Sequence, residues 1–282
     1  MQSNLFLRVI SALFLAPIVL GSIWFGRDFY LDYSIPLYTI LLAVFGTGLA
    51  WEWSHMFEKK VSVNTLLMAM FACICAFLTE SNPGVALWFA VLGTTIVFYR
   101  SGSKLLYSMG LLYICVPLIS LGYIYYVNES ISREIVLWLF FVVWATDIGG
   151  YVVGKTVGGP KIAPKISAKK TWSGLLGAIL FAMGVAYVFA LYLKANNFLS
   201  PSSGISFDQL KYVLIGSAGV LAVVAQVGDF FESYIKRSLN LKDSSNIIPG
   251  HGGLFDRVDG LLFASVLTAL IIYIFNDGGM LF

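Results

Sequence analysis

Acidic residues interrupt stretches of this sequence that are otherwise apolar. Asp147 follows the run LWLFFVVWAT, and Asp229 follows GVLAVVAQVG. Burying a carboxylate in a membrane-length apolar stretch is costly, so its presence there indicates function. Glu232 comes three residues after Asp229, and Asp256 comes three before Asp259, so each pair can share one helix face. Such a cluster suits a hard divalent cation with oxygen ligands, above all Mg²⁺. The alternative is that each acid pairs with a nearby cation or caps a helix.

Cations and glycines accompany these acids in the segment 233–260, SYIKRSLNLKDSSNIIPGHGGLFDRVDG. Lys and Arg side chains can neutralise phosphate groups, Arg by a bidentate fork. The cations of this segment are Lys236, Arg237, Lys242 and Arg257. Gly250, Gly252 and Gly253 surround His251 and let backbone amides approach an anion. Taken alone, the cations would signal membrane topology. Together with carboxylates and a glycine turn, they indicate a metal-bound polyphosphate.

The elements that must position these residues are membrane helices. Apolar residues of the AVILMFWYC class make up 59% of the 282 residues. Charged residues make up 12%, about half of the usual ~25%. This composition excludes a soluble domain, a disordered chain, a collagen-like repeat and a coiled coil. Cys73, Cys75 and Cys115 all lie inside apolar runs, which argues against a disulfide framework or a zinc site.

The sequence predicts an all-α polytopic integral membrane protein with about nine transmembrane helices, because each crossing needs about 20 mainly apolar residues. The expected spans are 9–26, 35–51, 63–79, 84–99, 105–127, 135–153, 172–193, 212–231 and 260–276. Most of the 18 Lys and Arg residues then fall on the side of the N-terminus. The positive-inside rule therefore predicts a cytoplasmic N-terminus and an external C-terminus.

Ionisable residues are unevenly distributed along the chain. Residues 1–130 are expected to form N-terminal transmembrane helices that act as a lipid-facing scaffold. Residues 131–282 are expected to form the C-terminal catalytic region, with long cytoplasmic loops at 154–171 and 232–259. No inverted internal repeat of the kind found in many transporters is visible.

The segment 233–260 closely resembles the signature of the phosphatidate cytidylyltransferases. That signature reads Ser, two residues, Lys-Arg, four residues, Lys-Asp, then Pro or Gly before His-Gly-Gly, then Asp-Arg-x-Asp. The matching residues are Ser233, Lys236, Arg237, Lys242, Asp243, Pro249, His251, Gly252, Gly253, Asp256, Arg257 and Asp259. The upstream segments QVGDFFES and DIGGYVVGKTVGG resemble two further motifs of that family.

One motif departs from the family pattern. The family usually has Ser-Pro-x-Lys-Thr-x-Glu-Gly where this chain has SAKKTWSG, so Ala168 replaces Pro and Ser173 replaces Glu. Lys170 and Thr171 remain, and the resemblance keeps this loop as a substrate contact.

The resemblance implies a nucleotidyltransferase that joins CTP and phosphatidate to give CDP-diacylglycerol and pyrophosphate, with Mg²⁺ and room for a second metal ion. It implies a bacterial inner membrane protein whose active site faces the cytoplasm. Membrane lipids are expected partners and nucleic acid is not, and a homodimer stays open. The implied metal ligands are Asp229, Asp256, Asp259 and Asp147. The implied catalytic residues are Lys236, Arg237, Lys242, His251 and Arg257, and the implied substrate-binding residues are Lys170, Thr171, Ser233, Gly252 and Gly253.

Other readings remain. A cation-coupled transporter would also bury acids, although its site is expected at the midplane of the membrane. A CTP-dependent lipid kinase would need a base beside a hydroxyl acceptor, and a purely structural membrane protein leaves the acids unexplained. Gly149, Gly154, Lys155 and Thr156 satisfy the P-loop pattern. A true P-loop follows a buried strand, so we expect this match to lie in a membrane helix instead.

Overall fold

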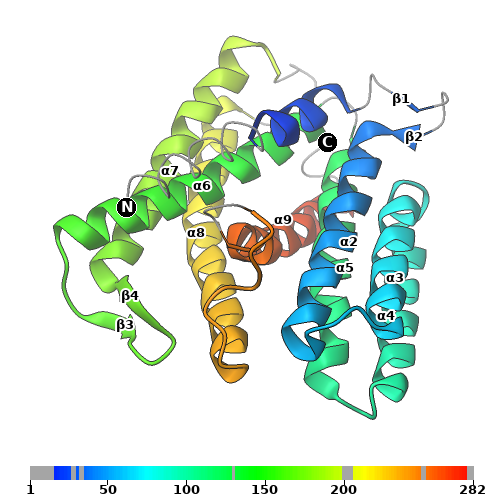
Figure 1. Ribbon diagram of the computed structural model, residues 1–282. Coiled ribbons are helices and arrows are strands. Elements are labelled where there is room, and N and C mark those ends of the chain that lie inside the picture. Colours follow the sequence, from blue (N-terminus) through cyan, green and yellow to red (C-terminus); the bar gives the residue numbers. More distant parts are fainter. Residues whose placement is uncertain are drawn as a thin grey trace. The chain divides into compact units, whose positions relative to one another are not determined.

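The computed structural model describes residues 16–26, 30–31, 35–128, 131–198, 206–248 and 252–277 (Figure 1). Among these residues, seven helices are long and apolar enough to cross a membrane. They are α3 (Val63–Ser81), α4 (Pro83–Arg100), α5 (Leu105–Tyr126), α6 (Ser132–Thr156), α7 (Trp172–Ala195), α8 (Phe207–Ser238) and the segment Phe255–Ile274, which contains the 3₁₀ turn η2 (Phe255–Arg257) and most of α9 (Asp259–Asp277). The helical architecture is confirmed, and the chain is an integral membrane protein.

The first two expected spans are less clear. A shorter apolar helix, Ala16–Phe25, lies within the expected span 9–26, of which residues 9–15 are outside the described part. Helix α2 (Leu37–Glu58) covers the expected span 35–51 but is not among the seven. Its C-terminal half carries Glu52, Ser54, His55 and Glu58, which lower its hydropathy. The total of nine spans and the orientation of the termini stay predictions.

Polar residues define where several helices begin. The Ser62 hydroxyl accepts a hydrogen bond from the Thr65 amide, and the Ser62 amide donates one to the Thr65 hydroxyl, which is a capping box before α3. Asn82 caps α4, with Pro83 at the first helical position. The short polar links between the apolar runs therefore contain the residues that cap the next helix.

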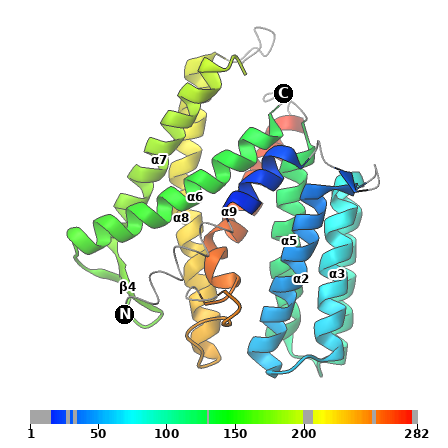
Figure 2. The ribbon, with the colours of Figure 1, turned by 45° about the horizontal axis from the view of Figure 1, so that its top comes forward.

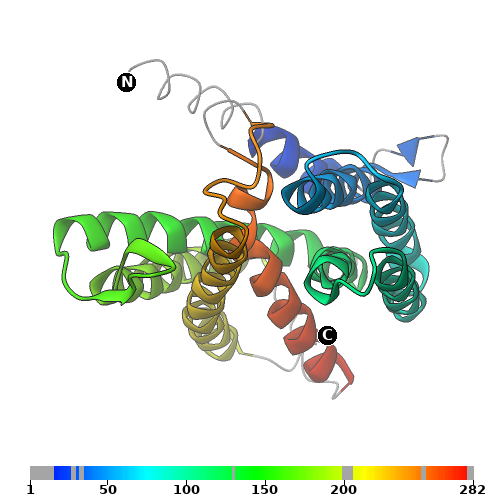
Figure 3. The same ribbon diagram turned by 60° about the horizontal axis from the view of Figure 1, so that its bottom comes forward.

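The chain divides into two compact units, and the first joins Met1–Tyr126 to Ile235–Val258. Its helices α2, α3, α4 and α5 pack side by side, as Figures 1 and 3 show. The interior is built from large side chains such as Trp53, Tyr107 and Phe255, all of which are buried. The segment 235–258 therefore belongs with helices that lie far before it in the sequence.

The second unit comprises Val127–Tyr234 and Asp259–Phe282. Helices α6 and α7 run alongside each other in it (Figure 2). A Cβ atom on Gly177 would lie 2.4 Å from Cβ of Val153, and one on Gly149 would lie 2.6 Å from the Gly177 carbonyl oxygen. Glycines therefore allow the close contact of these two helices.

This packing explains the sequence match to a P-loop. Gly149, Gly154, Lys155 and Thr156 all lie inside the continuous helix α6, which has no loop there to wrap a phosphate. The expectation of a membrane helix at this position is confirmed. The glycines of the pattern serve helix packing.

Two small antiparallel pairs of strands are additions that the sequence did not predict. Strands β1 (Tyr30–Leu31) and β2 (Ile35–Pro36) pair in the first unit. Strands β3 (Lys161–Ala163) and β4 (Ser167–Thr171) form a hairpin within the expected cytoplasmic loop 154–171. The hairpin ends directly at the start of α7, where the Thr171 hydroxyl accepts a hydrogen bond from the Gly174 amide at 3.1 Å.

Candidate functional site

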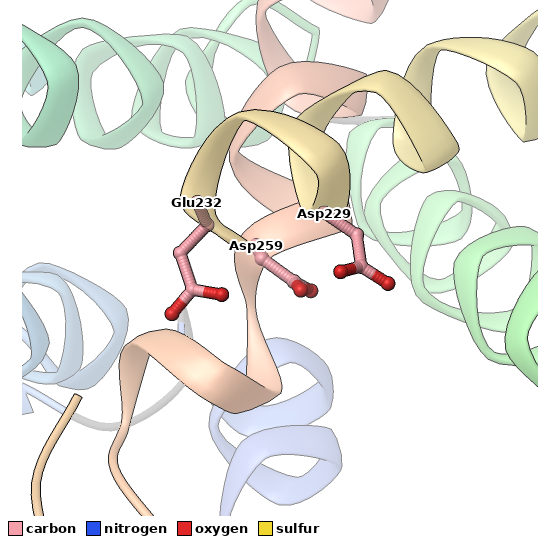
Figure 4. A group of neighbouring side chains, drawn as sticks. All are labelled: Asp229, Glu232 and Asp259. Atoms are coloured by element: carbon pink, nitrogen blue, oxygen red, sulfur yellow. The ribbon is translucent and has the colours of Figure 1, made fainter. Parts of the chain in front are cut away.

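Three carboxylates of the second unit converge at the crossing of α8 and α9. Asp229 and Glu232 lie one turn apart on α8, and Asp259 is the first residue of α9. One oxygen from each lies within 4.8 Å of the others (Figure 4). Glu232 is buried, and the other two are half-buried. Like charges gathered this closely repel one another unless a cation lies between them, and an all-oxygen set is what Mg²⁺ prefers.

Glycine makes this convergence possible. A Cβ atom on Gly228 would lie 2.5 Å from the Asp259 carbonyl oxygen and 3.2 Å from Cβ of Phe263. A Cβ atom on Gly260 would likewise lie 3.2 Å from Cβ of Ala225. Because neither glycine carries a side chain, the start of α9 can approach α8 closely enough to place Asp259 beside Asp229 and Glu232.

The β3–β4 hairpin contributes a cation to this cluster. Lys170 in β4 forms an ion pair with Asp229, and its ammonium lies 4.8 Å from the centre of the Phe230 ring. Ser233 donates a hydrogen bond of 3.2 Å to Asp229. Thr171 is buried and serves as the helix cap described above. The structure thus brings Lys170 and Ser233 to the acids, while Thr171 fixes the end of the strand that carries Lys170.

Asp147 lies on α6 of the same unit and is exposed. It is not one of the three residues whose carboxylate oxygens lie together. The sequence predicted Asp147 as a metal ligand, and its assignment to the metal stays a prediction.

Asp256 belongs to the first unit, where donors of the protein surround its carboxylate. One oxygen pairs with the ammonium of Lys236. The other accepts hydrogen bonds from the Ser244 amide at 3.0 Å, the Ser244 hydroxyl at 3.0 Å and the Gly253 amide at 2.8 Å. Asp256 therefore ties α8 to both ends of the glycine turn. Its predicted role as a metal ligand stays untested.

The two predicted glycines form the turn that these bonds close. Gly252 has a φ of +86°, a conformation that favours glycine, and its carbonyl accepts a hydrogen bond from the Ile248 amide at 2.9 Å. A Cβ atom on Gly253 would lie 1.8 Å from the Ser244 hydroxyl oxygen. The backbone conformation at Gly252 therefore disfavours other residues, and Gly253 has no space for a side chain.

A pocket of about 360 Å³ opens in the first unit between the end of α2 and the loop after α8. His55 of α2 and Lys59, which directly follows α2, line it, and His55 stacks on Trp51 with the ring centres 5.0 Å apart. Lys242, Asp243, Ser244, Ser245 and Asn246 line it from the loop. Its cations and hydroxyl groups suit an anion. His55 and Lys59 were not predicted, because they lie far before the signature segment 233–260 in the sequence.

The remaining predicted cations have other surroundings. Arg237 is exposed and donates a hydrogen bond of 2.9 Å to the Leu241 carbonyl. Arg257 is exposed in η2. His251 lies outside the described residues.

Sequence reasoning missed Glu52 of α2, whose side chain is fully buried. Its carboxylate accepts hydrogen bonds from the Leu254 amide at 2.6 Å and the Phe255 amide at 2.8 Å. The Ser245 hydroxyl also donates to it, and the Ser244 hydroxyl shares its one hydrogen between Glu52 and Asp256. A signal was present, since an acidic residue interrupts the sequence LAWEWSHM, but it lay just past an expected span.

Comparison with known proteins gives one consistent answer. The sequence model of the cytidylyltransferase family matches residues 6–275. A phosphatidate cytidylyltransferase of Brucella suis is 32% identical over 98% of this chain and 96% of its own length. One of Rickettsia bellii is 33% identical over 98% of this chain and 92% of its own length. Because the match runs along nearly the whole of both proteins and includes the residues described above, the chain belongs to the cytidylyltransferase family.

Proposed function

We propose that this chain joins CTP to phosphatidate, giving CDP-diacylglycerol and pyrophosphate. Membership of the family and the activity for which its relatives are named support this reaction. The observation that carries it at the level of the site is the convergence of Asp229, Glu232 and Asp259. A cation held there is suited to reactions between phosphate groups, which repel one another.

The reaction needs little covalent chemistry from the protein. An oxygen of the phosphatidate phosphate forms a bond to the α-phosphorus of CTP, and the bond from that phosphorus to the bridging oxygen of pyrophosphate breaks. The attacking oxygen is already anionic, so no strong general base is required. Catalysis then consists of positioning the two phosphates and neutralising their charge.

In this proposal Asp229, Glu232 and Asp259 hold Mg²⁺, with Asp147 as a further ligand. The cation would neutralise phosphate charge and polarise the phosphorus centre that is attacked. Glu232 was not in the set that the family resemblance implied, and it joins the proposal because its carboxylate lies within the cluster. Lys170 orients Asp229 through its ion pair.

The cations of the first unit contact the nucleotide in this proposal. Lys59 and Lys242 line the pocket and would neutralise phosphates of CTP, with a hydrogen bond from Asn246. Arg237, Arg257 and His251 stay assigned to phosphate groups on the family resemblance. Lys236 and Asp256 fix the turn beside the pocket through their buried ion pair.

The proposed location is the cytoplasmic side of a bacterial inner membrane. CTP is a cytosolic nucleotide, and phosphatidate lies in the membrane leaflet, so the site must be open to both. The excess of Lys and Arg on one side of the predicted topology supports this orientation. Those cations would also attract an anionic lipid.

The decisive experiment uses the full chain purified in detergent, with phosphatidate, CTP and Mg²⁺, and follows both the lipid product and pyrophosphate. We expect CDP-diacylglycerol and pyrophosphate in equal amounts. Release of CDP and a phosphorylated lipid, when a lipid alcohol such as diacylglycerol replaces phosphatidate, would identify a lipid kinase. Absence of both turnover and CTP binding in folded protein would refute nucleotidyl transfer and favour transport.

A further inference from the structure

We infer that Glu52 is a positioning residue for the CTP-binding loop, acting from a helix that the signature does not include. The inference rests on the proposed function, because it concerns how this chain uses CTP. It assigns a role in the reaction to the N-terminal half of the chain, for which the sequence predicted only a lipid-facing scaffold.

Hydrogen bonds from the signature segment hold the Glu52 carboxylate in this place. Glu52 is fully buried. A buried carboxylate is tolerated only where hydrogen bonds replace its water. Here each of its oxygens receives one backbone amide and one hydroxyl: Leu254 and Ser245 on one oxygen, Phe255 and Ser244 on the other. All four donors come from the signature segment, so the carboxylate binds that segment and not its own helix.

The hydrogen bonds of Glu52 join two separate parts of the signature segment. Ser244 and Ser245 precede the glycine turn, and Leu254 and Phe255 follow it. Glu52 therefore bridges the two arms of the turn. Gly253 leaves the space for this contact, because a Cβ atom there would lie 2.7 Å from an oxygen of Glu52.

Apolar contacts align the same segment against the helices. The buried ring of Phe255 packs between Trp53 of α2 and Tyr113 of α5, with ring centres 5.8 Å and 5.7 Å away. These contacts hold the segment close to α2, but they have little directional preference. The four hydrogen bonds of Glu52 fix the position of the segment along α2.

Two serines connect Glu52 to the pocket. Ser244 and Ser245 line the pocket beside Lys242, and both donate to Glu52. Ser244 also donates to Asp256, the partner of Lys236. Loss of the Glu52 carboxylate therefore displaces the residues proposed to bind CTP without removing any of them.

The test compares Glu52→Gln with the matched control Glu58→Gln, which lies on the same helix, bonded to Asn64. Gln has the same size, but it replaces one acceptor oxygen with a donor that faces other donors. We expect kcat/KM for CTP to fall about 10- to 100-fold, the range for loss of a hydrogen bond to a charged group. KM for phosphatidate should stay within about twofold, and E58Q should resemble the wild type in both.

Two further measurements separate positioning from general stability. Amide exchange in E52Q should become faster in the peptide 244–257 and stay unchanged in α3, α4 and α5. Ser245→Ala removes one donor and should lower kcat/KM for CTP less than E52Q does. The double variant should be no worse than E52Q alone, since both changes break one contact.

The outcomes divide clearly. Wild-type kcat/KM in E52Q overturns the inference. Faster exchange throughout the first unit in E52Q, combined with an unaffected S245A, also overturns it, because Glu52 would then serve only stability. If E52Q does not fold, a selective loss in kcat/KM for CTP in folded S245A supports the inference. If the wild type itself makes no CDP-diacylglycerol, the proposed function fails, whereas the exchange comparison still tests whether Glu52 holds the loop.

Discussion

The acidic residues of this chain differ in what surrounds them. Asp229, Glu232 and Asp259 face one another, and Lys170 forms an ion pair with Asp229. Asp256 instead has an ammonium, two amides and a hydroxyl as partners. Residue type alone does not distinguish these environments, and they lead to different expectations for substitution.

Asp259→Asn should abolish the metal-dependent activity. It removes one of three carboxylates from the cluster while keeping the size of the side chain, so kcat should fall more than about 100-fold. The matched control is Asp208→Asn at the other end of α8, where the exposed carboxylate pairs with Lys211 at 2.7 Å. Turnover assays on both variants check this, and equal activity of D259N and D208N contradicts the cluster.

Lys236→Met should destabilise the first unit by about 3–5 kcal/mol, because it leaves the buried carboxylate of Asp256 without its ion-pair partner. The double variant Lys236→Met with Asp256→Leu should recover part of this loss. Unfolding of the detergent-solubilised variants measures both. A double variant less stable than K236M would show that Asp256 is satisfied by Ser244 and Gly253 alone.

At the level of elements, the site depends on how closely helices approach. Helix α9 begins against α8 at Gly228, and α6 packs on α7 through Gly149 and Gly177. The hairpin β3–β4 ends where α7 starts, and this short path delivers Lys170 to Asp229. Small side chains at helix crossings are typical of membrane proteins, where close backbone packing replaces the hydrophobic effect.

Gly228→Ala should impair activity although it touches no substrate. The added methyl group would lie 2.5 Å from the Asp259 carbonyl and push the start of α9 away from Asp229. We expect about a tenfold loss of kcat, together with weaker metal binding. Gly216→Ala on the same helix is the control, since nothing lies within 4 Å of the added methyl group there. G216A should be active and equally or more stable, because alanine favours helix.

Lys155→Ala tests the P-loop pattern directly. Lys155 lies within α6 and donates a hydrogen bond of 3.1 Å to the Tyr151 hydroxyl, both exposed. A surface helix residue of this kind should change KM for CTP and kcat by no more than about twofold. Loss of CTP binding in K155A, with the fold retained, would instead give this lysine the phosphate-binding role of a P-loop.

At the level of the whole molecule, the described residues combine seven apolar helices of membrane length with a polar segment that returns to the first unit. Residues 235–258 pack with the helices before Tyr126, although more than a hundred residues separate them in the sequence. Each unit therefore contains residues from both halves of the chain.

Removal of divalent cations should abolish turnover reversibly. A chelator should reduce CDP-diacylglycerol formation to background, and added Mg²⁺ should restore it, since the three carboxylates repel one another without a cation. Added Mg²⁺ should also raise the unfolding temperature of the wild type but not of D259N, because a ligand that binds only the folded state stabilises it. Full activity in excess chelator contradicts the proposed metal site.

The sequence by itself determined the helical membrane architecture, the family and most of the residues proposed for the site. Apolar runs of membrane length can form little other than helices in a bilayer, and the motifs that contain Asp229, Glu232 and Asp259 can be recognised in the sequence alone. Only the tertiary structure decided that Asp259 of α9 meets Asp229 and Glu232 of α8, that Lys170 reaches Asp229, and that Glu52 binds the signature loop. Those contacts depend on where helices cross, and crossing geometry is set by the packing of residues far apart in the chain, which no local pattern records.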